Sequence, residues 1–92
     1  MRTIHKFEIP NDRAPHAIEL QRPAMPIACS YQPWNGQWVL WAVVDTDSPD
    51  RVQRRFQWFN TGEKIPMRGM IEHVGTVQLD DKPYVAHLLE VF

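Results

Sequence analysis

The strongest concentration of side chains able to bind another molecule lies between residues 51 and 68. This stretch contains five cationic side chains and a single anionic one, Glu63, and aromatic residues are interleaved with them. The cations are Arg51, Arg54, Arg55, Lys64 and Arg68. Guanidinium groups bind carboxylates and phosphates through paired hydrogen bonds, so the stretch predicts a contact with an acidic partner or with nucleic acid. The structural alternative is a solvated basic face over an aromatic core.

Trp34 is the second candidate, because the surrounding sequence predicts that it lies at the tip of a β-hairpin. Asn35-Gly36 stands between two apolar segments and favours a tight type I′ turn. A large aromatic at such a tip gains little from its own core, and exposed tryptophan is over-represented among binding hot spots. The alternative is that Trp34 folds back over Pro33 or Trp38.

Side chains that enzymes use are present, but their spacing forms no catalytic or metal-binding pattern. Cys29 lies in an apolar segment, where a buried thiol behaves as a small hydrophobic group. The histidines His5, His16, His73 and His87 lack the close spacings of zinc motifs. Asp45, Asp47 and Asp50 begin like a calcium loop, yet Asp50 stands where such a loop requires glycine. We therefore predict no catalytic residue, no metal site and no cofactor.

Charge and composition argue against several classes of function. Ten Lys and Arg against eleven Asp and Glu leave a net charge of −1 over 92 residues, whereas nucleic-acid-binding domains usually carry a basic excess. The single cysteine excludes an internal disulfide, and no apolar run has the length of a signal peptide or a membrane span. We expect a soluble protein of a reducing cytoplasm, with no direct nucleic-acid or membrane binding.

Apolar and polar residues alternate with a period of two along most of the chain, which predicts β-strands. The expected strands cover residues 3–9, 17–20, 27–32, 37–44, 52–59, 70–79 and 83–92. A short helix capped by Ser48 and running through Arg54 is the alternative for one segment. The pattern predicts an all-β fold, a small antiparallel sandwich or barrel of about seven strands with little or no helix, as a single domain over residues 1–92.

Two hairpins set the expected strand register. A two-residue loop at Asn35-Gly36 would place Tyr31 opposite Leu40.

A second two-residue loop, at Asp81-Lys82, would place Thr76 opposite His87 and His73 opposite Glu90. The two histidines would then project from opposite faces of the sheet and could not share a metal.

Several segments resemble, in order, a family of proteins of about this length that bacteriophages and prophages carry. The segments are residues 4–10 (IHKFEIP), 40–49 (LWAVVDTDSP), 61–66 (TGEKIP), 74–78 (VGTVQ) and 86–91 (AHLLEV). The family is catalogued as a domain of unknown function. The resemblance implies a phage-encoded accessory protein in the cytoplasm of the bacterial host, a setting in which small β-domains often act by stoichiometric binding.

We expect a non-enzymatic protein that binds a host or phage protein or ribonucleoprotein complex, with inhibition of a host defence complex as one form of that binding. The expected contacts are Arg51, Arg54, Arg55 and Arg68, or the Trp34 tip. Replacing Arg54 and Arg55 by glutamate should then abolish binding and leave the melting temperature nearly unchanged. The alternatives are a small-molecule protein that binds a nucleotide signal and a minor structural protein of the virion. A homodimer through exposed edge strands is an additional prediction.

Overall fold

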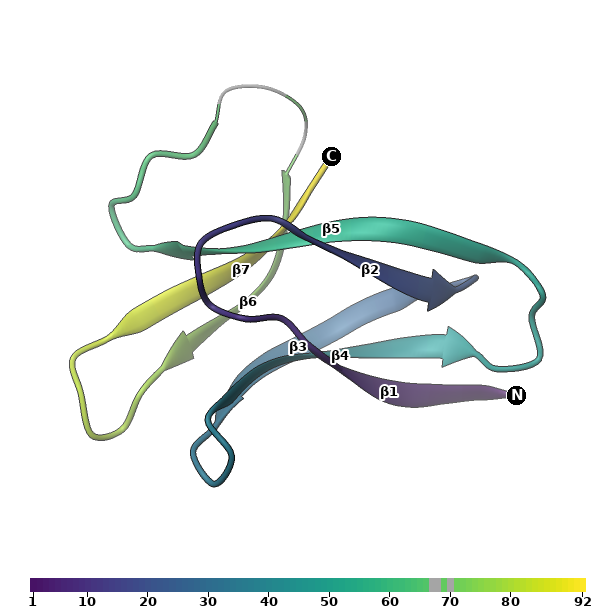
Figure 1. Ribbon diagram of the computed structural model, residues 1–92, viewed down its shortest axis with the longest axis horizontal. Helices are drawn as coiled ribbons and strands as arrows, with labels where there is room; N and C mark the ends of the chain where they lie inside the picture. The colour runs from purple at the N-terminus through teal and green to yellow at the C-terminus, as the bar shows by residue number, and fades with distance from the viewer. Residues whose placement is uncertain (67–68, 70) are drawn as a thin grey trace.

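The computed structural model describes residues 1–66, 69 and 71–92, which form seven β-strands and no helix (Figure 1). The strands are β1 (Arg2–Glu8), β2 (His16–Gln21), β3 (Met25–Gln32), β4 (Gln37–Asp45), β5 (Arg51–Asn60), β6 (Ile71–Gln78) and β7 (Val85–Val91). The all-β class and the number of strands are confirmed, whereas the helical alternative before Arg54 is wrong. In the described part of the chain, no helix is long and apolar enough to cross a membrane.

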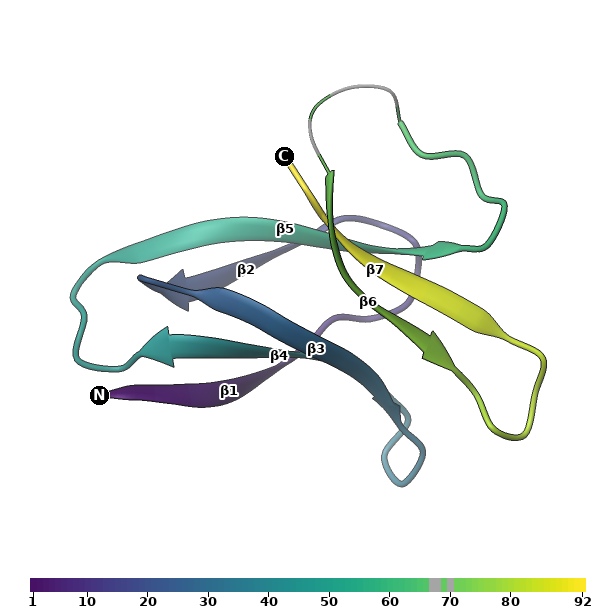
Figure 2. The same cartoon turned by 180° about the vertical axis from the view of Figure 1, so that it is seen from behind.

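The strands form two antiparallel sheets. The first has the order β1-β4-β3 and the second the order β2-β5-β7-β6. The edge strands β3 and β6 contact each other, and both lie on the side that faces the viewer in Figure 2. Because no ladder joins the two sheets in the described strands, the architecture is a sandwich and not a closed barrel.

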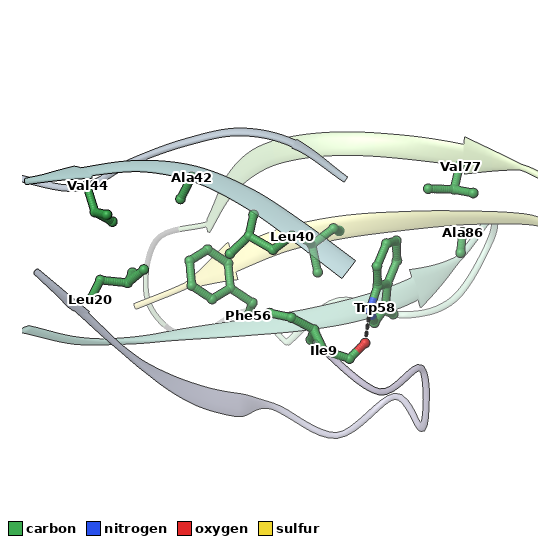
Figure 3. Packing of buried hydrophobic residues seen from close by; sticks show 10 residues of the cluster. Ile9, Leu20, Leu40, Ala42, Val44, Phe56, Trp58, Val77 and Ala86 are labelled. Atoms are coloured by element: carbon green, nitrogen blue, oxygen red, sulfur yellow. Dashed lines mark hydrogen bonds between the residues drawn. The ribbon is translucent and has the colours of Figure 1, made fainter. Parts of the chain in front are cut away.

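The core lies between the sheets and is built mainly from alternate residues of the central strands β4, β5 and β7, with further residues from β2, β6 and the end of β1 (Figure 3). Its buried members are Ile9, Leu20, Leu40, Ala42, Val44, Phe56, Trp58, Val77, Ala86 and Leu88. The Trp58 indole Nε1 donates a hydrogen bond of 2.8 Å to the Ile9 carbonyl oxygen (Figure 3). This bond gives the one polar atom of a fully buried indole a partner, and ties the end of β1 to the centre of the second sheet.

The β3–β4 hairpin forms, but with a loop of four residues instead of two. Tyr31 lies opposite Trp38 and not opposite Leu40. The Gly36 N–H donates to the Gln32 carbonyl at 2.8 Å, and Gly36 has a φ of 69°, which glycine adopts without strain. The predicted register is therefore wrong by two residues. Because this error is even, the side chains of residues 28–32 still point to their predicted faces. A bulge between Pro26 and Ala28 then shifts the pairing by one more residue, and Ile27, predicted to share the face of Cys29, is 43% exposed.

The β6–β7 hairpin has the predicted register near its loop and a different register further on. Thr76 lies opposite His87, as predicted. A bulge then shifts the pairing, so that His73 lies opposite Leu89 and not opposite Glu90. A bulge places one extra residue on its strand and changes the face to which the following side chains point.

Gly75, next to this bulge, allows β6 to lie close to β3. A Cβ atom on Gly75 would lie 2.8 Å from the Cys29 Sγ atom, closer than real side-chain contacts. We expect Gly75→Ala to lower the free energy of unfolding by about 1–3 kcal/mol through overpacking, as measured by denaturant titration. Adding Cys29→Ala removes the sulfur and should restore most of the loss. A Gly75→Ala protein as stable as the wild type would contradict the close approach of β3 and β6.

Candidate functional site

Of the four arginines predicted to bind a partner, the three that the structure describes do not share one face of the sheet. Along β5 successive side chains point to opposite faces of the sheet. Arg51 and Arg55 are exposed and share the outer face, whereas Arg54 points inward with Phe56. Arg68 lies outside the described residues. Arg54 therefore does not belong to the predicted arginine face, whereas Arg51 and Arg55 share one face of β5.

Arg54 is held inside the protein by a buried partner. Its Nε and Nη2 atoms donate to the two carboxylate oxygens of Glu90, each at 2.6 Å, and its Nη1 donates to the Ala24 carbonyl at 2.7 Å. Glu90 is only 2% exposed. The hydrogen bonds to Glu90 raise the pKa of Arg54. The Arg54–Glu90 contact argues against the expectation that replacing Arg54 and Arg55 by glutamate leaves the melting temperature nearly unchanged, because a glutamate at position 54 would lie beside the Glu90 carboxylate.

A groove of about 660 Å³ opens beside this ion pair, where β7 ends. One wall is β5 around Val52 and Arg55, and the other is the segment 22–24, which crosses from the second sheet to the first. Arg22 and Arg55 are exposed at the groove, so it has a basic rim. We call this feature the arginine groove.

Trp34 is 77% exposed at the tip of the β3–β4 hairpin. The alternative in which it folds back over its neighbours is therefore wrong. The base of the hairpin is held by stacked aromatics, since the Tyr31 and Trp38 ring centroids lie 4.8 Å apart and those of Trp38 and Trp58 lie 5.0 Å apart. An exposed indole thus projects from a well-anchored hairpin.

A second groove, of about 430 Å³, lies beside this hairpin. It is lined by Tyr31 and Pro33 on one side and by residues 77–82 of the β6–β7 hairpin on the other. The tips of both hairpins lie at the same end of the molecule, away from the start of β5 (Figure 1). We call the surface formed by residues 31–36 and 77–82 the hairpin end. It is separate from the arginine groove, so the two predicted contacts belong to different surfaces.

Cys29 and the loop that carries Asp45, Asp47 and Asp50 have structural roles in the fold. Burial raises the pKa of the Cys29 thiol to about 11, so the nucleophilic thiolate is scarce at neutral pH. The Asp45 carboxylate accepts the Asp47 N–H at 3.0 Å, which forms a turn. The ammonium group of Met1 donates to both carboxylates, and these bonds raise its pKa. Over residues 1–66, 69 and 71–92, no three His, Cys, Asp or Glu side chains are grouped to hold a metal ion.

A hydrogen-bonded row on the outer face of the second sheet was not predicted. The Thr76 Oγ1 atom lies 3.2 Å from His73 Nε2 and 2.9 Å from His87 Nδ1. His87 Nε2 in turn lies 2.8 Å from Thr61 Oγ1. The two histidines therefore share a face, contrary to the prediction, because the bulge before Gly75 turns His73 around. A glycine inside a strand pattern is the sequence signal that would have indicated the bulge.

Comparison with known proteins places the chain in a family. The family model described as a domain of unknown function (DUF7352) matches residues 1–92. The chain therefore belongs to this family. A search of curated proteins and a search of solved structures each gave no match.

Proposed function

We propose that this member of the family is a non-enzymatic binding protein that holds a protein partner at its hairpin end, with Trp34 as the anchor. We further propose that it is a phage-encoded accessory protein of the bacterial host cytoplasm. Its partner is then a host or phage protein, alone or in a ribonucleoprotein complex, and inhibition of a host defence complex is the form of binding that fits this setting.

The exposure of Trp34 is the observation that carries the proposal. Trp58 is fully buried, and Trp38 and Trp41 are half-buried, but Trp34 leaves 77% of its surface in water. Exposing so large an apolar side chain forgoes roughly 1.5–3 kcal/mol of burial, and a partner that covers it recovers this free energy. Binding hot spots are enriched in tryptophan and are surrounded by contacts that exclude water.

The groove beside Trp34 supplies the rest of an interface. Tyr31, Pro33 and Leu79 line it, so a partner side chain can enter between the two hairpins while Trp34 contacts the partner's surface. The stacked aromatic base holds the hairpin in place before binding, which reduces the ordering cost of association. The setting is supported by the segments that resemble phage and prophage proteins, and stoichiometric binding is common among small domains of that kind.

Affinity capture from infected host cells tests this proposal. Tagged wild-type protein, Trp34→Ala and Met25→Ala are compared for the protein chains that they retain. Met25 is a matched control, because it is an apolar side chain that is 52% exposed on β3, away from the hairpin tip. We expect the wild type and Met25→Ala to retain one and the same chain, and Trp34→Ala to lose it.

Retention of that chain by Trp34→Ala at the wild-type level would contradict the proposed anchor. Native mass spectrometry of the captured wild type separates the other classes of function. A retained small molecule without a protein chain would favour a small-molecule carrier instead. Co-purification with intact phage particles would favour a structural role in the virion.

A further inference from the structure

Among the described strands, none lies beside one edge of β5 over its first residues. β7 pairs with β5 only as far as Val91, which lies opposite Arg55. The other edge of β5 pairs with β2 along its whole first half, with Gln21 opposite Arg51. Of the strands that the structure describes, none pairs with the β7 side of residues 51–54.

The hydrogen-bonding pattern shows which backbone groups face this open side. The Arg22 N–H donates to the Asp50 carbonyl at 2.9 Å and extends the β2–β5 ladder by one residue. In an antiparallel strand the residues bond alternately to one neighbour and to the other. Even-numbered residues of this segment therefore bond to β2, and the N–H and C=O groups of Arg51 and Gln53 point to the side where β7 has ended.

The arginine groove lies on this open side. Gln53 and Val52 line it together with the end of β7, and the segment 22–24 closes it on the far side. Its volume of about 660 Å³ is larger than a single side chain needs and lies within the range of ligand sites. Phe92, which follows β7, also lines the groove, so a strand placed here would lie beyond Phe92 and beside Gln53 and Arg51.

We propose that the arginine groove binds an extended segment of a partner protein by strand addition, with acidic and apolar side chains alternating along that segment. The segment lies antiparallel to β5 beyond Val91, and its backbone pairs with Gln53 and Arg51. This site is independent of the hairpin end.

The alternation follows from the faces of β5. A residue opposite Gln53 points to the outer face, where Arg51 and Arg55 are its diagonal neighbours. An acidic side chain there lies between two guanidinium groups. A residue opposite Val52 points inward, toward the half-buried side of the groove, where an apolar side chain fits. Arg51 is partly engaged by Glu19 at 3.6 Å, so Arg55 is the main contact for the acidic group.

Titration with a defined peptide tests the proposal. The probe is a fluorescein-labelled peptide of seven residues in which glutamate and valine alternate, blocked at its C-terminus. Its controls are the same peptide with lysine in place of glutamate, and a peptide of the same composition with the alternation broken. We expect only the alternating acidic peptide to bind, with affinity that falls as salt is added. In heteronuclear NMR spectra, it should shift the amide signals of Arg51 and Gln53.

Three variants separate this site from a general charge effect. Arg55→Glu should weaken binding by more than about tenfold, because it turns an attraction into a repulsion. Gln53→Pro removes the proposed backbone donor, which takes no part in the β2 ladder, and should weaken binding to a similar extent. Lys82→Glu makes the same change of charge on the β6–β7 hairpin and should leave the affinity within about twofold.

Equal binding of the broken-alternation peptide, or amide shifts confined to residues outside the arginine groove, would overturn the proposal. Failure of Gln53→Pro to fold leaves the amide shifts of the wild type as the deciding measurement. Trp34→Ala should bind the peptide as the wild type does. This comparison tests the arginine groove independently of the proposed partner site at the hairpin end.

Discussion

Arg54→Ala is expected to lower the free energy of unfolding by about 3–5 kcal/mol, since it removes the ionic partner of the buried Glu90 carboxylate. Glu90 is 2% exposed, and its two oxygens accept two of the hydrogen bonds that Arg54 donates. The loss is to be measured by denaturant unfolding at neutral pH, followed by intrinsic tryptophan fluorescence.

The matched control replaces both members of the pair. Arg54→Met combined with Glu90→Leu removes both charges and fills a similar volume, and such replacements of buried ion pairs are often neutral. We expect the double variant to be more stable than Arg54→Ala alone. A loss below about 1 kcal/mol for Arg54→Ala, the value typical of a solvated surface pair, would show that Arg54 is free to bind a partner after all.

Trp58→Ala should be the second severe variant, with a loss of about 3–5 kcal/mol. Trp58 is fully buried at the centre of the core, and its removal leaves a cavity. It also leaves the Ile9 carbonyl oxygen without the hydrogen bond that it accepts at 2.8 Å. Because the free energy of unfolding of such domains is only about 5–15 kcal/mol in total, this loss is a large fraction of it, and the melting temperature should fall clearly.

Trp34→Ala is the matched control for this variant, because it removes the same side chain from an exposed position. We expect it to change the free energy of unfolding by no more than about 0.5 kcal/mol. Thermal melts followed by circular dichroism compare the two proteins with the wild type. Equal losses for Trp34→Ala and Trp58→Ala would contradict the distinction between a core tryptophan and a surface anchor.

The all-β class could be predicted because period-two alternation is local. Residues 37–44 are apolar on both faces, and they form most of β4, the central strand of the first sheet. The hairpin at Asn35-Gly36 could also be predicted from the sequence, but the length of its loop could not. Asn35-Gly36 favours a two-residue turn, and the observed four-residue loop also uses the preceding two residues.

The role of Arg54 depended on a contact that no local pattern contains. The alternation that points Arg55 away from Phe56 also points Arg54 inward, so its direction could be predicted from the strand alone. Its partner, Glu90, lies 36 residues away and comes from a strand whose register is set by pairing with β5. Grouping the arginines by their closeness in sequence therefore joined side chains that lie on two faces.

The histidine row and the arginine groove were missed for a related reason. A single bulged residue before Gly75 turns His73 to the face of His87, and bulges depend on packing against other strands. The groove lies beside the part of β5 where pairing with β7 has stopped, since the last pair is Arg55 with Val91 while β5 begins at Arg51. Strand lengths and register in the folded sheet decide this position. Trp34 was easier to predict, since a hairpin tip is exposed whatever the sheet order.

The dissociation constant of the captured partner, measured by isothermal titration calorimetry with wild-type and Trp34→Ala protein, tests most directly whether Trp34 anchors a partner. We expect Trp34→Ala to weaken binding by about 30-fold or more, as the loss of a hot-spot tryptophan does, while Met25→Ala stays within about twofold of the wild type. Dissociation constants that agree within about twofold for wild type and Trp34→Ala would contradict the proposal that the hairpin end is the binding site.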